Sequence, residues 1–377
     1  MNFHPIAEYM EQVLVKEKRV PGCDVLICRD HETLFRYSCG VRNYAATEPV
    51  RQDDLYHLYS CTKPITCTAA MQLVEQGLMD LDAPAESYLP EMKDVFLLKD
   101  GQPVPPQNKI TVRHLFTMSA GFDYNFRHPS IMDMAVSNPD ATTRDIVSTL
   151  FRRPLKFEPG TQFEYSMCHD ILAVLVEVVS GKRFSRYLKD HIFDPLGMID
   201  TGFHLSSSLR PRMAAQYRCP KAQTLTPIPQ RNDFELTENY ESGGAGLYST
   251  VQDYSLFADA MACGGTGKSG AQILKPETID LMRTEQLRSF AVNSEFTCAA
   301  GAGYGYGLGV RTLVDRSEGQ RSSLGEFGWD GAAGSYLMVD PTYRLSIVFS
   351  MHVNNWPALI GCGHAPIRDM TYDILGL

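Results

Sequence analysis

The sequence predicts an α+β fold (α/β sandwich-like) in which an antiparallel sheet flanked by helices carries an inserted, mainly helical domain. Strand patterns gather near the two ends of the chain, and they thin out between residues 81 and 240, where helical segments alternate with long loops. The chain of 377 residues is too long for one small core. We therefore expect one domain built from residues 1–80 and 241–377, and a second built from residues 81–240.

The strand patterns at the two ends are expected to join in one sheet. A helix over residues 6–18 precedes two strands, 23–29 and 33–37, which form a hairpin. The C-terminal part predicts helices over 251–262, 276–282 and 365–374, and strands over 304–313, 324–328, 335–340 and 345–353. Because such strands and helices bury their apolar faces against each other, the N-terminal hairpin should complete an antiparallel sheet with the C-terminal strands.

The middle of the chain predicts short helices and two long loops. The helices fall at residues 111–116, 142–151, 170–179 and 184–192. The loops, residues 122–140 and 205–236, are longer than ordinary connections, and loops of that length are more often functional than idle. Their aromatic residues are candidates for lining a pocket, with surface packing as the alternative: Phe122, Tyr124, Phe126 and Tyr217.

Composition excludes several classes of function. The net charge is -9 and the sequence pI is about 5.6, so no basic surface for nucleic acid is indicated. No apolar run approaches the roughly 20 residues of a membrane span. The N-terminus has no basic start followed by an apolar core. We expect a cytoplasmic protein with no nucleic-acid or membrane partner, and its oligomeric state is open.

The ten cysteines do not indicate a metal site. None forms a C-x-x-C pair and no H-E-x-x-H motif exists, so we expect no metal, no cofactor and mostly buried, reduced thiols. The alternating glycines of residues 304–309 are a weak nucleotide-loop signal, because no lysine follows and the pattern is that of a strand. The absence of a G-x-S-x-G elbow disfavours an α/β-hydrolase.

The most informative stretch is Ser60-x-x-Lys63, which precedes a buried helix over residues 68–76. If the turn is helical, residues three apart face the same way, so the serine hydroxyl lies beside the lysine amine. The positive end of a helix and burial both disfavour an ammonium ion, so Lys63 can act as a base for Ser60. An S-x-x-K tetrad also arises by chance in a chain of this length, so the motif needs support from elsewhere.

Two further stretches supply that support in order. Tyr165-Ser166-Met167 lies between a turn and a buried helix, where a phenol oxygen can reach the serine, although a tyrosine packed under the turn is the alternative. Trp329-Asp330-Gly331 begins a run of small residues that would let a substrate backbone approach a strand closely, although Trp329 could equally be a core residue.

The ordered set Ser60-x-x-Lys63, Tyr165-Ser166-x and Trp329-x-Gly331 resembles the serine β-lactamase-like superfamily: class C β-lactamases, D-alanyl-D-alanine peptidases and family VIII carboxylesterases. The resemblance covers nearly the whole chain and implies a site in the cleft between an α/β domain and a helical domain. It implies Ser60 as nucleophile, and Lys63 and Tyr165 as base and proton shuttle in an order left open. The backbone N–H groups of Ser60 and Ala332 would form the oxyanion hole.

Two departures from the class C pattern favour neutral esters. Met167 stands where those enzymes carry an asparagine that binds the substrate's side-chain amide, and Trp329 stands where they carry a lysine that holds the substrate's carboxylate. Losing a charge-assisted anchor costs an anionic substrate about 1.5–3 kcal/mol. Asp330 would repel an anion if it faced the cleft. The sequence therefore predicts a serine hydrolase acting on short-chain carboxylic esters.

Other readings stay open. They are a β-lactamase or D-amino-acid peptidase, an acyltransferase that uses the same site, and a non-enzymatic binding protein on the same fold. The partner in each enzymatic case is a small-molecule ester or amide. The joint presence of Ser60, Lys63 and Tyr165 argues against the binding protein.

Overall fold

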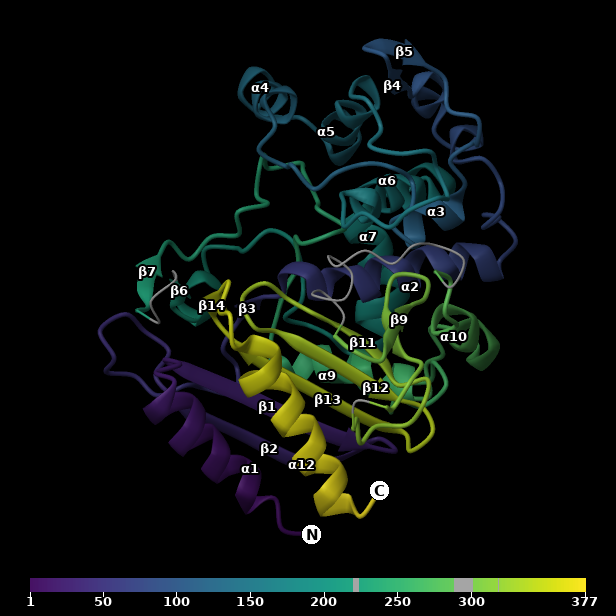
Figure 1. Cartoon of the computed structure of the whole chain (residues 1–377). Helices are drawn as coiled ribbons and strands as arrows, with labels where there is room; N and C mark the ends of the chain where they lie inside the picture. The colour runs from purple at the N-terminus through teal and green to yellow at the C-terminus, as the bar shows by residue number, and fades with distance from the viewer. Residues whose placement is uncertain (220–223, 288–300, 318) are drawn as a thin grey trace.

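The computed structural model describes residues 1–219, 224–287, 301–317 and 319–377. Its largest sheet has seven strands in the order β2-β1-β13-β12-β11-β10-β9, and every neighbouring pair is antiparallel (Figure 1). The strands are β1 Gly22–Arg29, β2 Glu32–Gly40, β9 Tyr304–Tyr306, β10 Arg311–Leu313, β11 Phe327–Asp330, β12 Tyr336–Asp340 and β13 Leu345–Met351.

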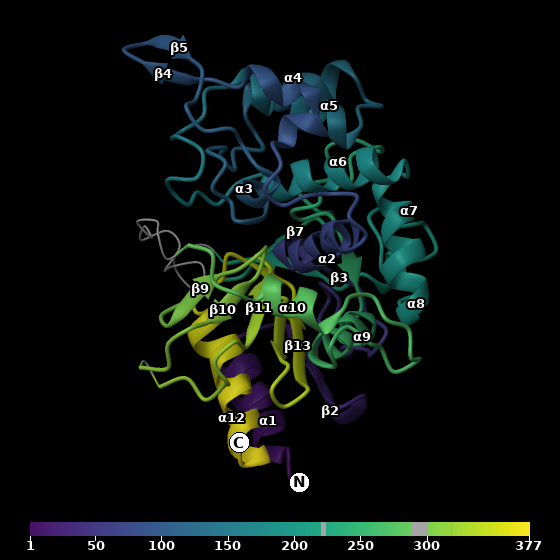
Figure 2. The same cartoon turned by 90° about the vertical axis from the view of Figure 1, so that its right-hand side faces the viewer.

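The N-terminal hairpin pairs with the last long strand, as predicted. Cys23 lies opposite Met351 and the register continues to Arg29 opposite Leu345. The central strands are buried on both faces, so successive residues enter different cores. Val25 joins an apolar cluster with helices α1 (His4–Tyr9, continued by wider turns over Met10–Glu17) and α12 (Ala365–Leu375), whereas Leu26 joins the cluster on the opposite face. Figures 1 and 2 show α1 and α12 side by side on one face.

The opposite face of the sheet is covered by α9 (Val251–Ala262) and faces α2 (Thr62–Glu75). In Figure 2, helix α2 lies between the sheet and the helices α3 to α6, and it packs against α6 (Cys168–Ser180). The other helices are α3 Val112–Phe116, α4 Pro129–Ser137, α5 Thr143–Ser148, α7 Phe184–Leu188, α8 Asp194–Leu196 and α10 Pro276–Met282. The smaller sheets pair β3 (Tyr56–His57) with β8 (Tyr248–Ser249), β4 (Leu97–Lys99) with β5 (Gln102–Val104), and β6 (Gln216–Arg218) with β7 (Thr226–Ile228) and β14 (Val353–Asn354).

The predicted α+β class is confirmed, and the domain limits at residues 80 and 240 stay predictions. Several local predictions were wrong. The loop expected over residues 205–236 contains strands β6 and β7. Residues 122–140 are not all loop, since α4 begins at Pro129. Proline is favourable as the first residue of a helix, because the backbone N–H that it lacks would have no acceptor within the helix at that position. Residues 304–313 form the β9–β10 hairpin, with Gly309 at a φ of 86° in the turn. The strand expected over 324–328 instead runs from Phe327 to Asp330, which places Trp329 within it.

Two further observations concern expected absences. In the part of the chain that the structure describes, no helix combines the length and apolar character needed to cross a bilayer. The nine described cysteines carry no disulfide, and Cys298 lies outside the described residues.

Candidate active site

Ser60 lies in a single 3-10 turn, η2 (Tyr59–Cys61), that leads directly into α2. Tyr59 has a φ of 46°, in the left-handed region that a bulky residue seldom adopts. Its buried side chain holds this conformation, because the hydroxyl donates to Gln216 Oε1 at 3.1 Å and accepts from Asn354 Nδ2 at 3.3 Å. Backbone strain held by its surroundings occurs most often at functional sites. The turn projects Ser60 out of the start of a buried helix.

The structure brings the three predicted catalytic side chains together. Lys63 Nζ donates to Ser60 Oγ at 3.2 Å, as the three-residue spacing requires. Tyr165 OH donates to the same oxygen at 2.8 Å, although it comes from the segment before α6, more than a hundred residues along the chain. Ser60 is half-buried, whereas Lys63 is fully buried. One hydroxyl therefore lies between an amine and a phenol, both within proton-transfer distance.

Lys63 has two further acceptors that sequence reasoning did not assign. Its Nζ donates to the Gly244 carbonyl at 2.7 Å and to Tyr124 OH at 3.4 Å. Burial raises the pKa of Tyr124 well above its ordinary value, so this phenol stays neutral. The glycine-rich stretch near residue 244 and the aromatic loop offered a signal, but neither indicates which atom would face the lysine.

Of the four aromatic residues of the long loops that were candidates for lining a pocket, two lie at or next to the site and two do not. Tyr124 is in the site, and its ring centroid lies 5.1 Å from that of Tyr165. Phe126 packs next to it against Phe234, at 4.3 Å between centroids. Phe122 is buried in the core against Phe151, and Tyr217 packs on Tyr44, so the pocket interpretation was wrong for these two.

The third motif lies against the first two through β11. Trp329 Nε1 donates to Tyr165 OH at 3.3 Å, so Trp329 is a site residue as well as a buried one. Gly331 is required for a reason other than the one expected. A Cβ placed there would lie 2.2 Å from the Leu58 carbonyl, so the closely packed backbone belongs to the protein rather than to a substrate. This contact fixes the strand end against the turn that carries Ser60.

Asp330 does not present a free negative charge. Its carboxylate is paired with the guanidinium of Arg311, and its Oδ1 lies 2.9 Å from His364 Nδ1. Burial alone would raise the pKa of Asp330, but Arg311 and His364 outweigh burial and hold it below its ordinary value. The expected repulsion of anions by Asp330 is therefore largely compensated.

A cavity of about 460 Å³ opens beside Ser60. Among the described residues that line it, none is a lysine or an arginine. They are Ser60, Tyr165, Trp329, Asp330, Gly331, Ala332, Asn355, Trp356, Pro357, Leu359 and Ile360. The Ala332 N–H, part of this lining, makes no hydrogen bond to another described residue. This N–H is therefore available to an oxyanion in the cavity.

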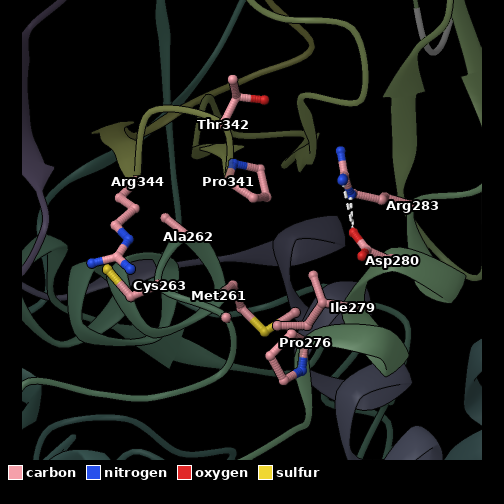
Figure 3. Close-up of a pocket in the computed structure, with 11 residues that line it drawn as sticks. Met261, Ala262, Cys263, Pro276, Ile279, Asp280, Arg283, Pro341, Thr342 and Arg344 are labelled. Carbon is pink, nitrogen blue, oxygen red and sulfur yellow. Dashed lines mark hydrogen bonds and ion pairs between the residues drawn. The ribbon is translucent and has the colours of Figure 1, made fainter.

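A second cavity, of about 400 Å³, lies between α9, α10 and the turn after β12 (Figure 3). Its one thiol among the described lining residues is Cys263, and burial, with Asp259 adding to it, raises the pKa of that thiol to about 12. The lining also holds the hydroxyl of Thr342, for which no lysine or histidine in the same described lining could act as a base. Figure 3 shows the nearby Asp280 and Arg283 paired with each other, at 2.7 Å. This cavity therefore lacks an activated nucleophile.

His31, Asp259 and Cys263 bring three possible metal ligands within 4.8 Å of one another, a cluster that the sequence spacing did not reveal. However, His31 Nδ1 lies 2.8 Å from one carboxylate oxygen of Asp259, and the backbone N–H of His31 donates to the other oxygen at 3.1 Å. Both carboxylate oxygens already serve to hold the β1–β2 turn against α9.

Comparisons with known proteins identify the family of this chain. A family model described as beta-lactamase matches residues 6–360. The chain belongs to the beta-lactamase family. Protein Rv1367c of Mycobacterium tuberculosis is 29% identical over 340 residues, covering 87% of this chain and 84% of that protein. Esterase EstB of Burkholderia gladioli is 30% identical over 265 residues, covering 63% of this chain and 65% of that protein.

A solved structure resembles the whole chain. It is EstCE1, described as a hydrolase with promiscuous acyltransferase activity, with a TM-score of 0.81 and 25% identity over 98% of this chain and 99% of that one. The chain is thus an enzyme of the β-lactamase-related serine hydrolases, a family whose members include named esterases and acyltransferases.

The two residues that depart from the class C β-lactamase pattern, Met167 and Trp329, lie in different places in the fold. Met167 is fully buried at the start of α6 and does not line the cavity beside Ser60. Trp329 lines that cavity and contacts Tyr165 directly. Of the two departures, therefore, only Trp329 lies at the cavity beside Ser60.

Proposed function

We propose that this enzyme hydrolyses neutral carboxylic esters with short acyl chains through an acyl-enzyme on Ser60. The observation that carries the proposal is the position of Ser60 Oγ, 3.2 Å from Lys63 Nζ and 2.8 Å from Tyr165 OH, at the wall of a cavity whose described lining holds no lysine or arginine. A nucleophile activated in this way can attack an ester carbonyl, and water can then release the acyl group.

The contacts of Lys63 favour Tyr165 as the group that takes the Ser60 proton. As an ammonium ion, Lys63 would have an acceptor for each of its three N–H bonds: Ser60 Oγ, Tyr124 OH and the Gly244 carbonyl. Its charge, 4.6 Å from the centre of the Tyr165 ring, and the Trp329 N–H would both stabilise a phenolate at Tyr165.

The reaction can be followed proton by proton. With Lys63 as the ammonium ion and Tyr165 as the phenolate, Tyr165 accepts the hydroxyl proton as Ser60 Oγ attacks, and the N–H groups of Ser60 and Ala332 receive the negative charge on the former carbonyl oxygen. Tyr165 then returns the proton to the departing alkoxide, which leaves as an alcohol. A water molecule repeats the sequence on the acyl-enzyme and releases a carboxylic acid.

A paired rate assay tests the function. Purified enzyme is given p-nitrophenyl butyrate and, separately, a chromogenic cephalosporin, with Ser60→Ala as the control for each. We expect fast hydrolysis of the ester, little of the cephalosporin, and loss of both in Ser60→Ala. A Ser60→Ala variant that keeps its esterase rate would contradict the proposal, and rapid cephalosporin hydrolysis would favour a β-lactamase.

Acyl transfer is the second candidate, because the resembling EstCE1 is described as having promiscuous acyltransferase activity. It differs only in the acceptor, since an alcohol in the cavity replaces water. Adding a primary alcohol to the ester assay and measuring the new ester against the free acid separates the two outcomes.

A further inference from the structure

One wall of the cavity beside Ser60 is apolar and comes from a segment that the catalytic motifs do not include. Residues 355–360 follow the last strand, and five of them line the cavity: Asn355, Trp356, Pro357, Leu359 and Ile360. The largest apolar side chains among them are those of Trp356, Leu359 and Ile360. Trp356 is buried, Leu359 is half-buried, and Ile360 is 41% exposed at the rim. An exposed isoleucine facing a cavity gains most when a ligand covers it.

This wall ends at a histidine that reaches back to the active-site strand. Leu359 and Ile360 begin the wide helical turns of η8 (Leu359–His364), and His364 closes them. His364 Nδ1 lies 2.9 Å from Asp330 Oδ1, and its Nε2 lies 3.4 Å from the Gly334 carbonyl. The histidine therefore contacts both ends of the turn that carries Ala332.

The histidine ring is held rigidly at this junction. It stacks on Tyr336 with 4.4 Å between ring centroids and meets Phe349 edge-on at 5.9 Å. Only 3% of its side chain is exposed, and 15% of that of Asp330. The second oxygen of Asp330 is paired with buried Arg311, so the carboxylate is fixed from both sides. A buried pair of this kind is costly to break from one side.

We propose that the wall of Trp356, Leu359 and Ile360 is the subsite for a bulky apolar group of the ester, and that the Asp330–His364 pair positions this wall relative to Ser60. The inference rests on the proposed esterase function and deepens it. Asp330 acts here as a positioning residue, since it joins the strand of Trp329 to the wall and takes no proton from the substrate. The favoured substrates are neutral esters that carry a branched or aromatic apolar group.

The test compares substrates of increasing apolar size on the wild type and on two variants. One series varies the acyl group from acetyl to pivaloyl and benzoyl in ethyl esters. The other series keeps the acetyl group and varies the alcohol, and the reaction rate is measured as the acid released. Ile360→Ala should lower kcat/KM about tenfold for the largest group of one series and by a much smaller factor for ethyl acetate, which carries no bulky group on either side. The series that responds identifies whether the acyl group or the alcohol lies on the wall.

Asp330→Asn should reproduce this size-dependent loss, mainly through KM, because the carboxylate that holds His364 is gone while Ser60, Lys63 and Tyr165 remain. In the double variant with His364→Gln the two losses should not add, since both break one contact. Asp315→Asn, an exposed aspartate far from this cavity in sequence and contacts, is the matched control and should behave as wild type.

The outcomes separate this inference from the proposed function. Wild-type enzyme without Ser60-dependent ester hydrolysis would overturn both. Ester hydrolysis whose dependence on apolar size is unchanged in Ile360→Ala would overturn the subsite. Additive losses in the double variant, or an equal loss for acetate and for the large groups in Asp330→Asn, would overturn the positioning role. If Asp330→Asn does not fold, Ile360→Ala, at a half-exposed rim position, still decides the subsite.

Discussion

The indole N–H of Trp329 donates a hydrogen bond of 3.3 Å to the phenol oxygen of Tyr165, and the two rings lie nearly parallel with 6.0 Å between centroids. The residue that replaces the lysine of class C β-lactamases thus contacts the group we propose as the base. Under the proposed function, this one position would both leave the described lining of the cavity without a cation and support proton transfer through Tyr165.

Trp329→Phe should test that hydrogen bond, because it keeps an aromatic ring and removes the N–H. A net hydrogen bond is worth about 1 kcal/mol, so kcat on p-nitrophenyl butyrate should fall about fivefold with a smaller change in KM. In the same assay, the kcat of Tyr165→Phe should be at least a hundredfold lower than that of the wild type. A Trp329→Phe enzyme as fast as wild type would mean that the indole N–H has no part in the reaction.

Gly331→Ala should damage the contact between the strand end and the Ser60 turn. The added Cβ would meet the Leu58 carbonyl at 2.2 Å, a backbone atom that cannot rotate away. Overpacking of this kind costs about 1–3 kcal/mol, so both the Tm and kcat should fall. Gly361→Ala is the matched control, because no atom lies within 4 Å of its added Cβ. Equal melting temperatures for the two variants would contradict the prediction.

Asp170→Ala should loosen the stretch whose Gly244 carbonyl accepts a hydrogen bond from Lys63. Buried Asp170 accepts hydrogen bonds from Tyr240 OH at 2.8 Å and Ser242 Oγ at 2.6 Å, which hold the stretch leading to Gly244. Removing the carboxylate takes the acceptor away from two buried O–H groups, at about 1–3 kcal/mol each. Denaturant unfolding should show this loss, and kcat should fall because the Gly244 carbonyl no longer fixes Lys63. Ser242→Ala should lose less stability and less kcat than Asp170→Ala.

Acid should destabilise the fold through a buried histidine. Burial lowers the pKa of His352 to about 4, against 6.5 when it is exposed. A depressed histidine pKa means that below pH 6.5 the unfolded chain binds a proton that the folded chain refuses, so stability falls with falling pH until about pH 4. At pH 5 this residue alone should cost about 2 kcal/mol relative to pH 8.

The measurement is denaturant unfolding at pH 8 and pH 5 for wild type, His352→Gln and, as a control, exposed His4→Gln. His352→Gln should show a smaller loss of stability between the two pH values, and His4→Gln should match wild type. An identical loss in all three proteins would rule out His352 as a source of the acid sensitivity.

Much of the site could be predicted because its first part is local. Ser60 and Lys63 are one helical turn apart, so helix geometry alone brings their side chains together once α2 forms. Tyr165 and the Trp-x-Gly motif required the family resemblance, since nothing near them in sequence indicates that they face Ser60. The loop prediction over residues 122–140 was wrong because loop-forming residues are frequent in this segment, although Pro129 at the first turn favours the helix that the structure has there.

The sequence by itself determined the class of fold, the helix that presents Ser60 and the residue types of the reaction, because periodic burial and short spacings are properties of local chain geometry. The tertiary structure alone decided that Asp330 is held by Arg311 and His364 and that Gly331 faces the Leu58 carbonyl. These contacts join segments that lie far apart along the chain. Their partners are selected by packing of the whole sheet, and no local pattern of side chains encodes that choice.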